Sequence, residues 1–76
     1  MRSLEYTDEN GIRVGVETYS AGYLDSALSV YRQDSNGEWV QVFSHPCYVS
    51  ADCDPCDDML REWADEIMAE HLDPTL

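Results

Sequence analysis

The sequence contains no lysine, and its strongly basic residues are four arginines set against sixteen aspartates and glutamates. The formal net charge at pH 7 is therefore −12. A surface this acidic repels nucleic acid, anionic membranes and acidic substrates over a Debye length of about 10 Å. Its charge instead favours a basic protein surface or a cation as the partner.

Long apolar runs are also missing, because no stretch approaches the roughly 18 consecutive apolar residues that a membrane span needs. The residues near residue 1 contain no basic segment followed by an apolar run, so no signal peptide is predicted. The three cysteines are an odd number, which fits a reducing compartment better than a framework of disulfides. We therefore expect a cytoplasmic protein that makes no contact with a membrane.

The hydrophobic content, 43% of the residues, is enough for one folded domain over residues 1–76. Alternating polar and apolar residues predict β-strands, and the turn sequences DENG and DSNG separate two pairs of them. The predicted strands cover residues 3–7, 12–20, 26–33 and 38–44. The sequence thus predicts an α+β fold, in which an antiparallel β-meander of three to four strands (3–44) is followed by a loop (45–56) and packs against one C-terminal amphipathic α-helix (55–72).

The helix has clear signals at its start, with Asp54 suited to the N-cap and Pro55 to the first helical position. Its apolar residues recur with helical spacing and predict one buried face. That face comprises Met59, Leu60, Trp63, Ala64, Ile67, Met68 and His71. We expect His71 to be a partly buried structural histidine, favoured by its place near the negative end of the helix dipole.

Four residues of the segment 45–56 have the side chains of a Cys3His zinc site, in the pattern H-x-C-x5-C-x2-C: His45, Cys47, Cys53 and Cys56. All four ligands would have to fold around one ion in a single short loop, whereas zinc sites usually draw two pairs from separate segments. The favoured interpretation is that these cysteines are free and pack as small hydrophobic residues, without a cofactor. A zinc site and a disulfide remain the alternatives.

The opposite side of the predicted helix is acidic almost without interruption. Asp58, Glu62, Glu66 and Glu70 repeat every four residues, which places neighbouring carboxylates about 6 Å apart along the helix. Residues 45–76 carry nine acids and one arginine, against seven acids and three arginines in residues 1–44. Like charges at this spacing destabilise a helix, so the row predicts an interaction surface rather than a contribution to folding.

The acidity is also compatible with two alternatives. A generic acidic surface is expected of a protein from a high-salt organism, and a pair of carboxylates is also a common catalytic device. Catalysis needs a concave pocket and perturbed pKa values, and one sheet with one helix offers little cleft. We therefore expect that the protein is not an enzyme.

Small size, strong acidity, a sheet-plus-helix layout and a row of carboxylates resemble the small acidic phage-encoded inhibitors, which include anti-CRISPR proteins and other nucleic-acid mimics. The resemblance implies a non-enzymatic protein, acting in the cytoplasm of a bacterial host, that blocks the basic nucleic-acid-binding surface of a complex such as a CRISPR-Cas effector. The predicted partner-binding residues are Asp54, Asp57, Asp58, Glu62, Asp65, Glu66 and Glu70.

Two further hypotheses belong to a different class. A zinc-stabilised adaptor would use the cysteine and histidine residues named above. A self-associating module would use the strand 38–44, whose two faces are both apolar and carry Trp39 and Phe43, to form a homodimer.

Overall fold

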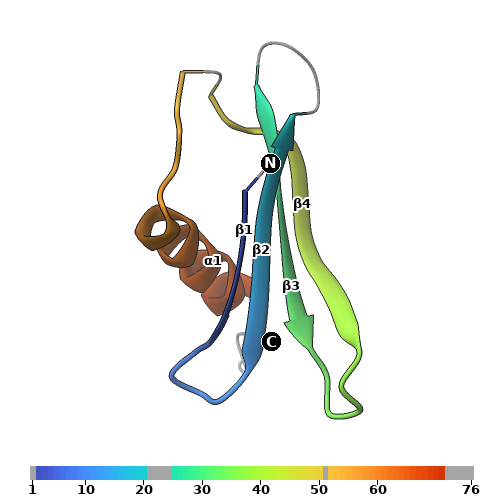
Figure 1. Cartoon of the computed structure of the whole chain (residues 1–76). Coiled ribbons are helices and arrows are strands. Elements are labelled where there is room, and N and C mark those ends of the chain that lie inside the picture. Colours follow the sequence, from blue (N-terminus) through green and yellow to red (C-terminus); the bar gives the residue numbers. More distant parts are fainter. Residues whose placement is uncertain (1, 21–24, 51, 72–76) are drawn as a thin grey trace.

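The structure is a computed structural model that describes residues 2–20, 25–50 and 52–71 (Figure 1). Within these residues it contains β1 (Arg2–Thr7), β2 (Arg13–Ser20), β3 (Ser26–Gln33), β4 (Trp39–Val49) and α1 (Asp57–His71). Each strand pairs antiparallel with the next, in the order β1-β2-β3-β4, and α1 packs on one face of the sheet. The predicted α+β meander with one C-terminal helix is confirmed.

The two predicted turns are built in the same way. A carboxylate oxygen of Asp8 accepts hydrogen bonds from two backbone N–H groups of its turn, each at 2.9 Å, and Asp34 does the same in the other. Each turn then needs a residue with positive φ, which glycine provides, at 81° for Gly11 and 84° for Gly37. These local bonds fix the register of β1 with β2 and of β3 with β4.

The core lies between α1 and one face of the sheet, because alternate strand residues point to that face. Its buried hydrophobic side chains come from all four strands and from the apolar side of α1. They are Tyr6, Val14, Val16, Leu28, Val30, Val49, Leu60, Ala64, Ile67 and Met68. The predicted apolar side of the helix is therefore the side that packs, with Met59 and Trp63 half-buried at its margin.

The sheet is longer than the predicted range 3–44, since it begins at Arg2 and β4 continues to Val49. The predicted loop 45–56 is wrong at its start for the same reason. Pro46 lies inside β4 and has no N–H to donate. An edge strand tolerates this, because the outer side of an edge makes no ladder hydrogen bonds, and β4 is an edge of this sheet.

The helix begins two residues later than predicted, at Asp57. The N–H of Leu60 donates to the carbonyl of Cys56 at 3.1 Å, so Cys56 stands at the N-cap where Asp54 was expected. Pro55 precedes the helix and is buried. At the other end α1 reaches His71, and residue 72 of the predicted range lies outside the described residues. No helix in the described ranges has the length and apolar content to cross a membrane.

Candidate functional site

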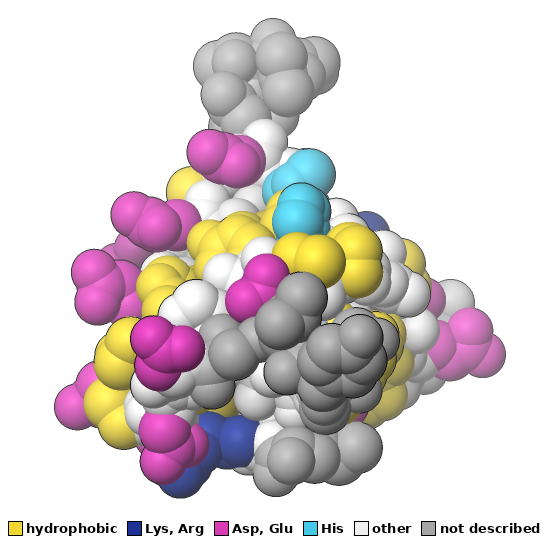
Figure 2. All heavy atoms as spheres, turned by 90° about the horizontal axis from the view of Figure 1, so that it is seen from above, with side chains coloured by type: hydrophobic (Ala, Val, Ile, Leu, Met, Phe, Trp, Pro, Cys, Tyr) yellow, Lys and Arg dark blue, Asp and Glu magenta, His cyan; other side chains and the backbone are white. Residues whose placement is uncertain are grey.

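The exposed side of α1 carries the four carboxylates that repeat every helical turn, hereafter the acidic row: Asp58, Glu62, Glu66 and Glu70. All four side chains are exposed, and none forms a hydrogen bond or ion pair with another described residue. Figure 2 shows many of the acidic side chains on the left of the molecule, the side on which Figure 1 places α1. The row is thus presented to solvent on a rigid element.

Arg61 is the one basic residue among these acids before His71, yet it does not neutralise the row. Its guanidinium carbon lies 4.9 Å from the centroid of the Tyr6 ring on β1, in a cation–π arrangement. The side chain is therefore directed toward the sheet. Arg61 therefore forms no ion pair with the acidic row.

Asp65, another of the predicted partner-binding residues, has a partner within the fold. The Tyr6 hydroxyl donates a hydrogen bond to its carboxylate at 2.6 Å, linking β1 to the middle of α1. Burial raises the pKa of the Tyr6 phenol above its ordinary value, and the hydrogen bond to Asp65 and the charge of that carboxylate raise it further. Tyr6 consequently stays a protonated donor at neutral pH, and Asp65 helps to hold α1 on the sheet.

Asp57 also has an internal partner, at the start of the helix. Its carboxylate lies 3.2 Å from the guanidinium of Arg2, and both side chains are largely exposed, at 61% and 45%. An ion pair this exposed contributes little to stability. The seven predicted partner-binding residues are all exposed, but Asp57 and Asp65 are engaged within the fold while Asp54 and the acidic row are available to a partner.

The four residues proposed as zinc ligands do not come together as a metal site in the described structure. Among the described residues, no three His, Cys, Asp or Glu side chains lie close enough together to hold a metal ion. The three cysteines are free. Cys53 is half-buried and packs against the core, as predicted, but Cys47 and Cys56 are exposed, so their predicted packing is wrong. Cys47 lies on the edge strand β4, where its N–H donates to Nδ1 of His45 at 3.1 Å.

An aromatic cluster joins the edge strand β4 to α1. The Tyr48 ring lies 5.7 Å from both the Phe43 and Trp63 rings, edge-on to each. Phe43 is also 6.0 Å from His71, and His45 is 6.3 Å from Tyr48. His71 itself is exposed rather than partly buried, because at the last turn of the helix it meets this cluster at the margin of the core.

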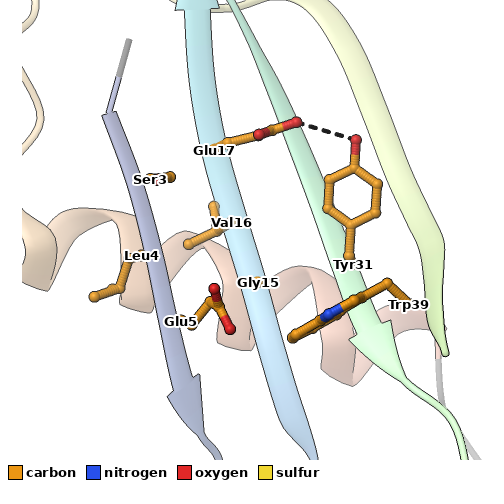
Figure 3. Close-up of a pocket in the computed structure, with 8 residues that line it drawn as sticks. All are labelled: Ser3, Leu4, Glu5, Gly15, Val16, Glu17, Tyr31 and Trp39. Carbon is orange, nitrogen blue, oxygen red and sulfur yellow. Dashed lines mark hydrogen bonds between the residues drawn. The ribbon is translucent and has the colours of Figure 1, made fainter. Parts of the chain in front are cut away.

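The face of the sheet that α1 leaves uncovered contains a pocket of about 320 Å³ (Figure 3). Six of its lining residues are Ser3, Glu5, Gly15, Glu17, Tyr31 and Trp39. The sequence patterns did not predict this pocket. Its signal was Gly15, which interrupts the valines of β2 and marks a close approach of another group to the backbone.

The largest unexplained feature of the described surface is the acidic row, with Asp54 near its N-terminal end. Relatives of known function would allow roles to be transferred to these residues one by one. No protein-family model, curated protein or solved structure matches this chain.

Proposed function

We propose that this protein is a non-enzymatic inhibitor that binds the basic nucleic-acid-binding surface of a protein complex, such as a CRISPR-Cas effector. In this proposal α1 enters a groove that normally holds a phosphate backbone. The acidic row and Asp54 take the place of phosphates, while the buried side of α1 stays on the sheet. Resemblance to the small acidic phage-encoded inhibitors supports the same function.

The observation that carries the proposal is that the acidic row is exposed and has no partner in the described part of the chain. Each pair of like charges four residues apart costs a few tenths of a kcal/mol of helix stability. Arg61, the one arginine of α1, stacks on Tyr6 and forms no ion pair with the row that would offset that cost. A partner outside the chain that supplies arginine and lysine side chains would offset it.

Carboxylates suit such a partner because the forked guanidinium group of arginine binds carboxylate and phosphate in the same bidentate way. Successive members of the row lie about 6 Å apart along a rigid helix, so little conformational entropy is lost when they bind together. The net charge of −12 would also speed association with a basic surface, and this attraction should weaken as salt is added.

The test is displacement of a fluorescent DNA duplex from purified CRISPR-Cas effectors and other DNA-binding complexes, followed by anisotropy. We expect the wild-type protein to displace the duplex from at least one effector. The double variant Glu62→Lys/Glu66→Lys should be weaker by about 100-fold or more, because two repulsive contacts replace two attractive ones. Circular dichroism should show that its fold is retained.

The matched control is Glu9→Lys/Glu38→Lys, which changes the net charge by the same amount at two exposed residues in the turns. It should displace the duplex nearly as well as the wild type. Equal weakening of both double variants would mean that only net charge matters, and α1 would not be the contact surface. Failure of the wild-type protein to displace DNA from any complex in the panel would contradict the proposed function.

A further inference from the structure

The pocket on the uncovered face of the sheet is separate from the acidic row, since α1 lies on the other face. Its volume of about 320 Å³ is near the lower end of the range of about 300–1,000 Å³ that is typical of small-molecule sites. It therefore suits a single side chain better than a large cofactor. Aromatic and acidic side chains together line it.

Trp39 forms one wall of the pocket. From the start of β4 its indole reaches across β3 toward β2, as Figure 3 shows, and lies against the backbone at Gly15. A Cβ at residue 15 would stand 3.4 Å from Cζ3 of the indole, a van der Waals contact, so the indole packs directly over the backbone of β2. Even in this position Trp39 is 43% exposed. A large aromatic surface is thus held in place and left open to a ligand.

Two carboxylates give the pocket its charge. Glu17 is half-buried, and its Oε1 accepts a hydrogen bond from the Tyr31 hydroxyl at 3.1 Å, while Oε2 has no hydrogen-bond partner among the described residues. Glu5 is exposed and lies 3.3 Å from the guanidinium of Arg13. Burial, and then the hydrogen bond to Glu17, raise the pKa of Tyr31, so the phenol remains a donor that orients this carboxylate.

From this geometry we infer that the pocket binds the guanidinium group of an arginine side chain presented by a protein partner. A planar cation can stack on the exposed indole of Trp39 and donate to the open oxygen of Glu17. Anionic and purely apolar ligands fit poorly beside two carboxylates. Glu5 already pairs with Arg13, which does not line the pocket, so the open oxygen of Glu17 is the acceptor that remains for a ligand.

The occupant should be an arginine within a polypeptide rather than the free amino acid. Free arginine is a net cation, but it would bring an α-carboxylate next to Glu5 and Glu17, where like charges repel it. A peptide-linked arginine has no such group. The inference does not depend on the proposed function of α1, because the two surfaces use different residues on opposite faces of the sheet.

The test is an NMR titration of the ¹⁵N-labelled protein with the peptide Ac-Gly-Arg-Gly-NH2 at physiological ionic strength. We expect saturable shifts at the Gly15 amide and the Trp39 indole N–H. The analogue with citrulline in place of arginine has nearly the same shape without the charge. The citrulline peptide should bind at least about tenfold more weakly, because the cation–π and ionic contacts are lost.

Two variants and a control locate the site. Trp39→Leu should weaken peptide binding by about tenfold and Glu17→Gln by about fivefold, since each removes one of the two contacts. Glu9→Gln removes an equivalent charge from an exposed turn and should leave binding unchanged. Because Trp39 lies on the surface, spectra of Trp39→Leu should show an intact core.

Several outcomes would overturn the inference: shifts confined to α1, equal binding of the citrulline peptide, or unchanged binding by Trp39→Leu. Concentration-dependent shifts at Trp39 without peptide would also overturn it, because a second copy of the chain would then occupy this face. Glu62→Lys/Glu66→Lys should still bind the peptide at Gly15. Failure of the α1 surface and failure of the pocket are therefore distinguishable.

Discussion

The two sides of α1 differ in how far the fold explains them. On the buried side, Leu60 and Ala64 are fully buried and Ile67 and Met68 are 4% exposed, so each residue has a packing reason. On the exposed side, the acidic row makes no contact that stabilises the chain within the described residues. Folding alone would be served better by alternating charges. The described contacts therefore give no packing reason for the composition of the exposed side.

Asp57 and Asp65 lie between these two cases. Both are exposed acids of α1, and both have partners on β1, namely Arg2 and Tyr6. Reversing either would remove a contact between α1 and β1 as well as change the surface charge. Glu62 and Glu66, which have no such partners, are therefore the cleaner positions at which to test binding.

The largest expected effect comes from breaking the buried side at Leu60. Leu60→Ala should lower the free energy of unfolding by about 2–5 kcal/mol, because it removes buried methyl groups and leaves a cavity between α1 and the sheet. Chemical denaturation followed by circular dichroism measures this change. Glu62→Ala is the matched control on the exposed side of the same helix and should change the free energy by less than about 0.5 kcal/mol.

A loss this large can leave a 76-residue domain unfolded, so a milder variant keeps the prediction measurable. Ile67→Val removes one methylene from a residue that is 4% exposed and should cost about 0.5–1.5 kcal/mol. If Glu62→Ala destabilised the protein as much as Ile67→Val, the contrast between the two sides of α1 would be lost.

The sequence predicted the buried side well because its signals are local. Alternation along the strands and helical spacing in α1 identify the faces that pack, and the aspartate and glycine in each turn fix the hairpins. Most strand boundaries were correct within one residue. The end of β4 was missed because Pro46 ordinarily argues against a strand, and only the position of β4 at the sheet edge makes it acceptable.

The contacts that give Asp57 and Asp65 partners within the fold could not be predicted from local sequence patterns. Tyr6 and Asp65 are 59 residues apart in the chain, and Arg2 and Asp57 are 55 apart. Their pairing depends on the angle and position at which α1 packs against β1, which no local spacing encodes. The pocket at Trp39 likewise requires the register of all four strands to be known.

A second prediction tests the hydrogen bond from the Tyr6 hydroxyl on β1 to Asp65 on α1. Tyr6→Phe keeps the buried ring and the face on which Arg61 stacks, but it removes the hydrogen bond to Asp65. The free energy of unfolding should fall by about 1.5–3 kcal/mol at pH 7, as is typical for a hydrogen bond to a charged acceptor. Tyr48→Phe is the control, because the Tyr48 hydroxyl has no hydrogen-bond partner among the described residues.

The same variant should change the response to alkaline pH. The folded protein holds the pKa of Tyr6 above its unfolded value, so the phenol favours the folded state fully below about pH 10 and loses this contribution as the pH rises further. The wild type should therefore lose stability more steeply above pH 10 than Tyr6→Phe. Equal slopes for the two proteins, measured by urea unfolding at pH 9 to 11, would show that Tyr6 is not held in this way.

The smallest expected effect has the opposite sign and concerns the exposed side. Glu62→Gln/Glu66→Gln removes two like charges from the acidic row without changing helix propensity appreciably. The free energy of unfolding should rise by a few tenths of a kcal/mol at low salt, and the gain should shrink at high salt as screening weakens the repulsion. Glu9→Gln/Glu38→Gln, outside the helix, controls for net charge and should gain less.

A loss of stability in the α1 variant would mean that the row supports the fold, and the reason for assigning it to a partner would disappear. A gain in stability together with weaker displacement of DNA would separate the two sides of α1 into one that folds the protein and one that binds.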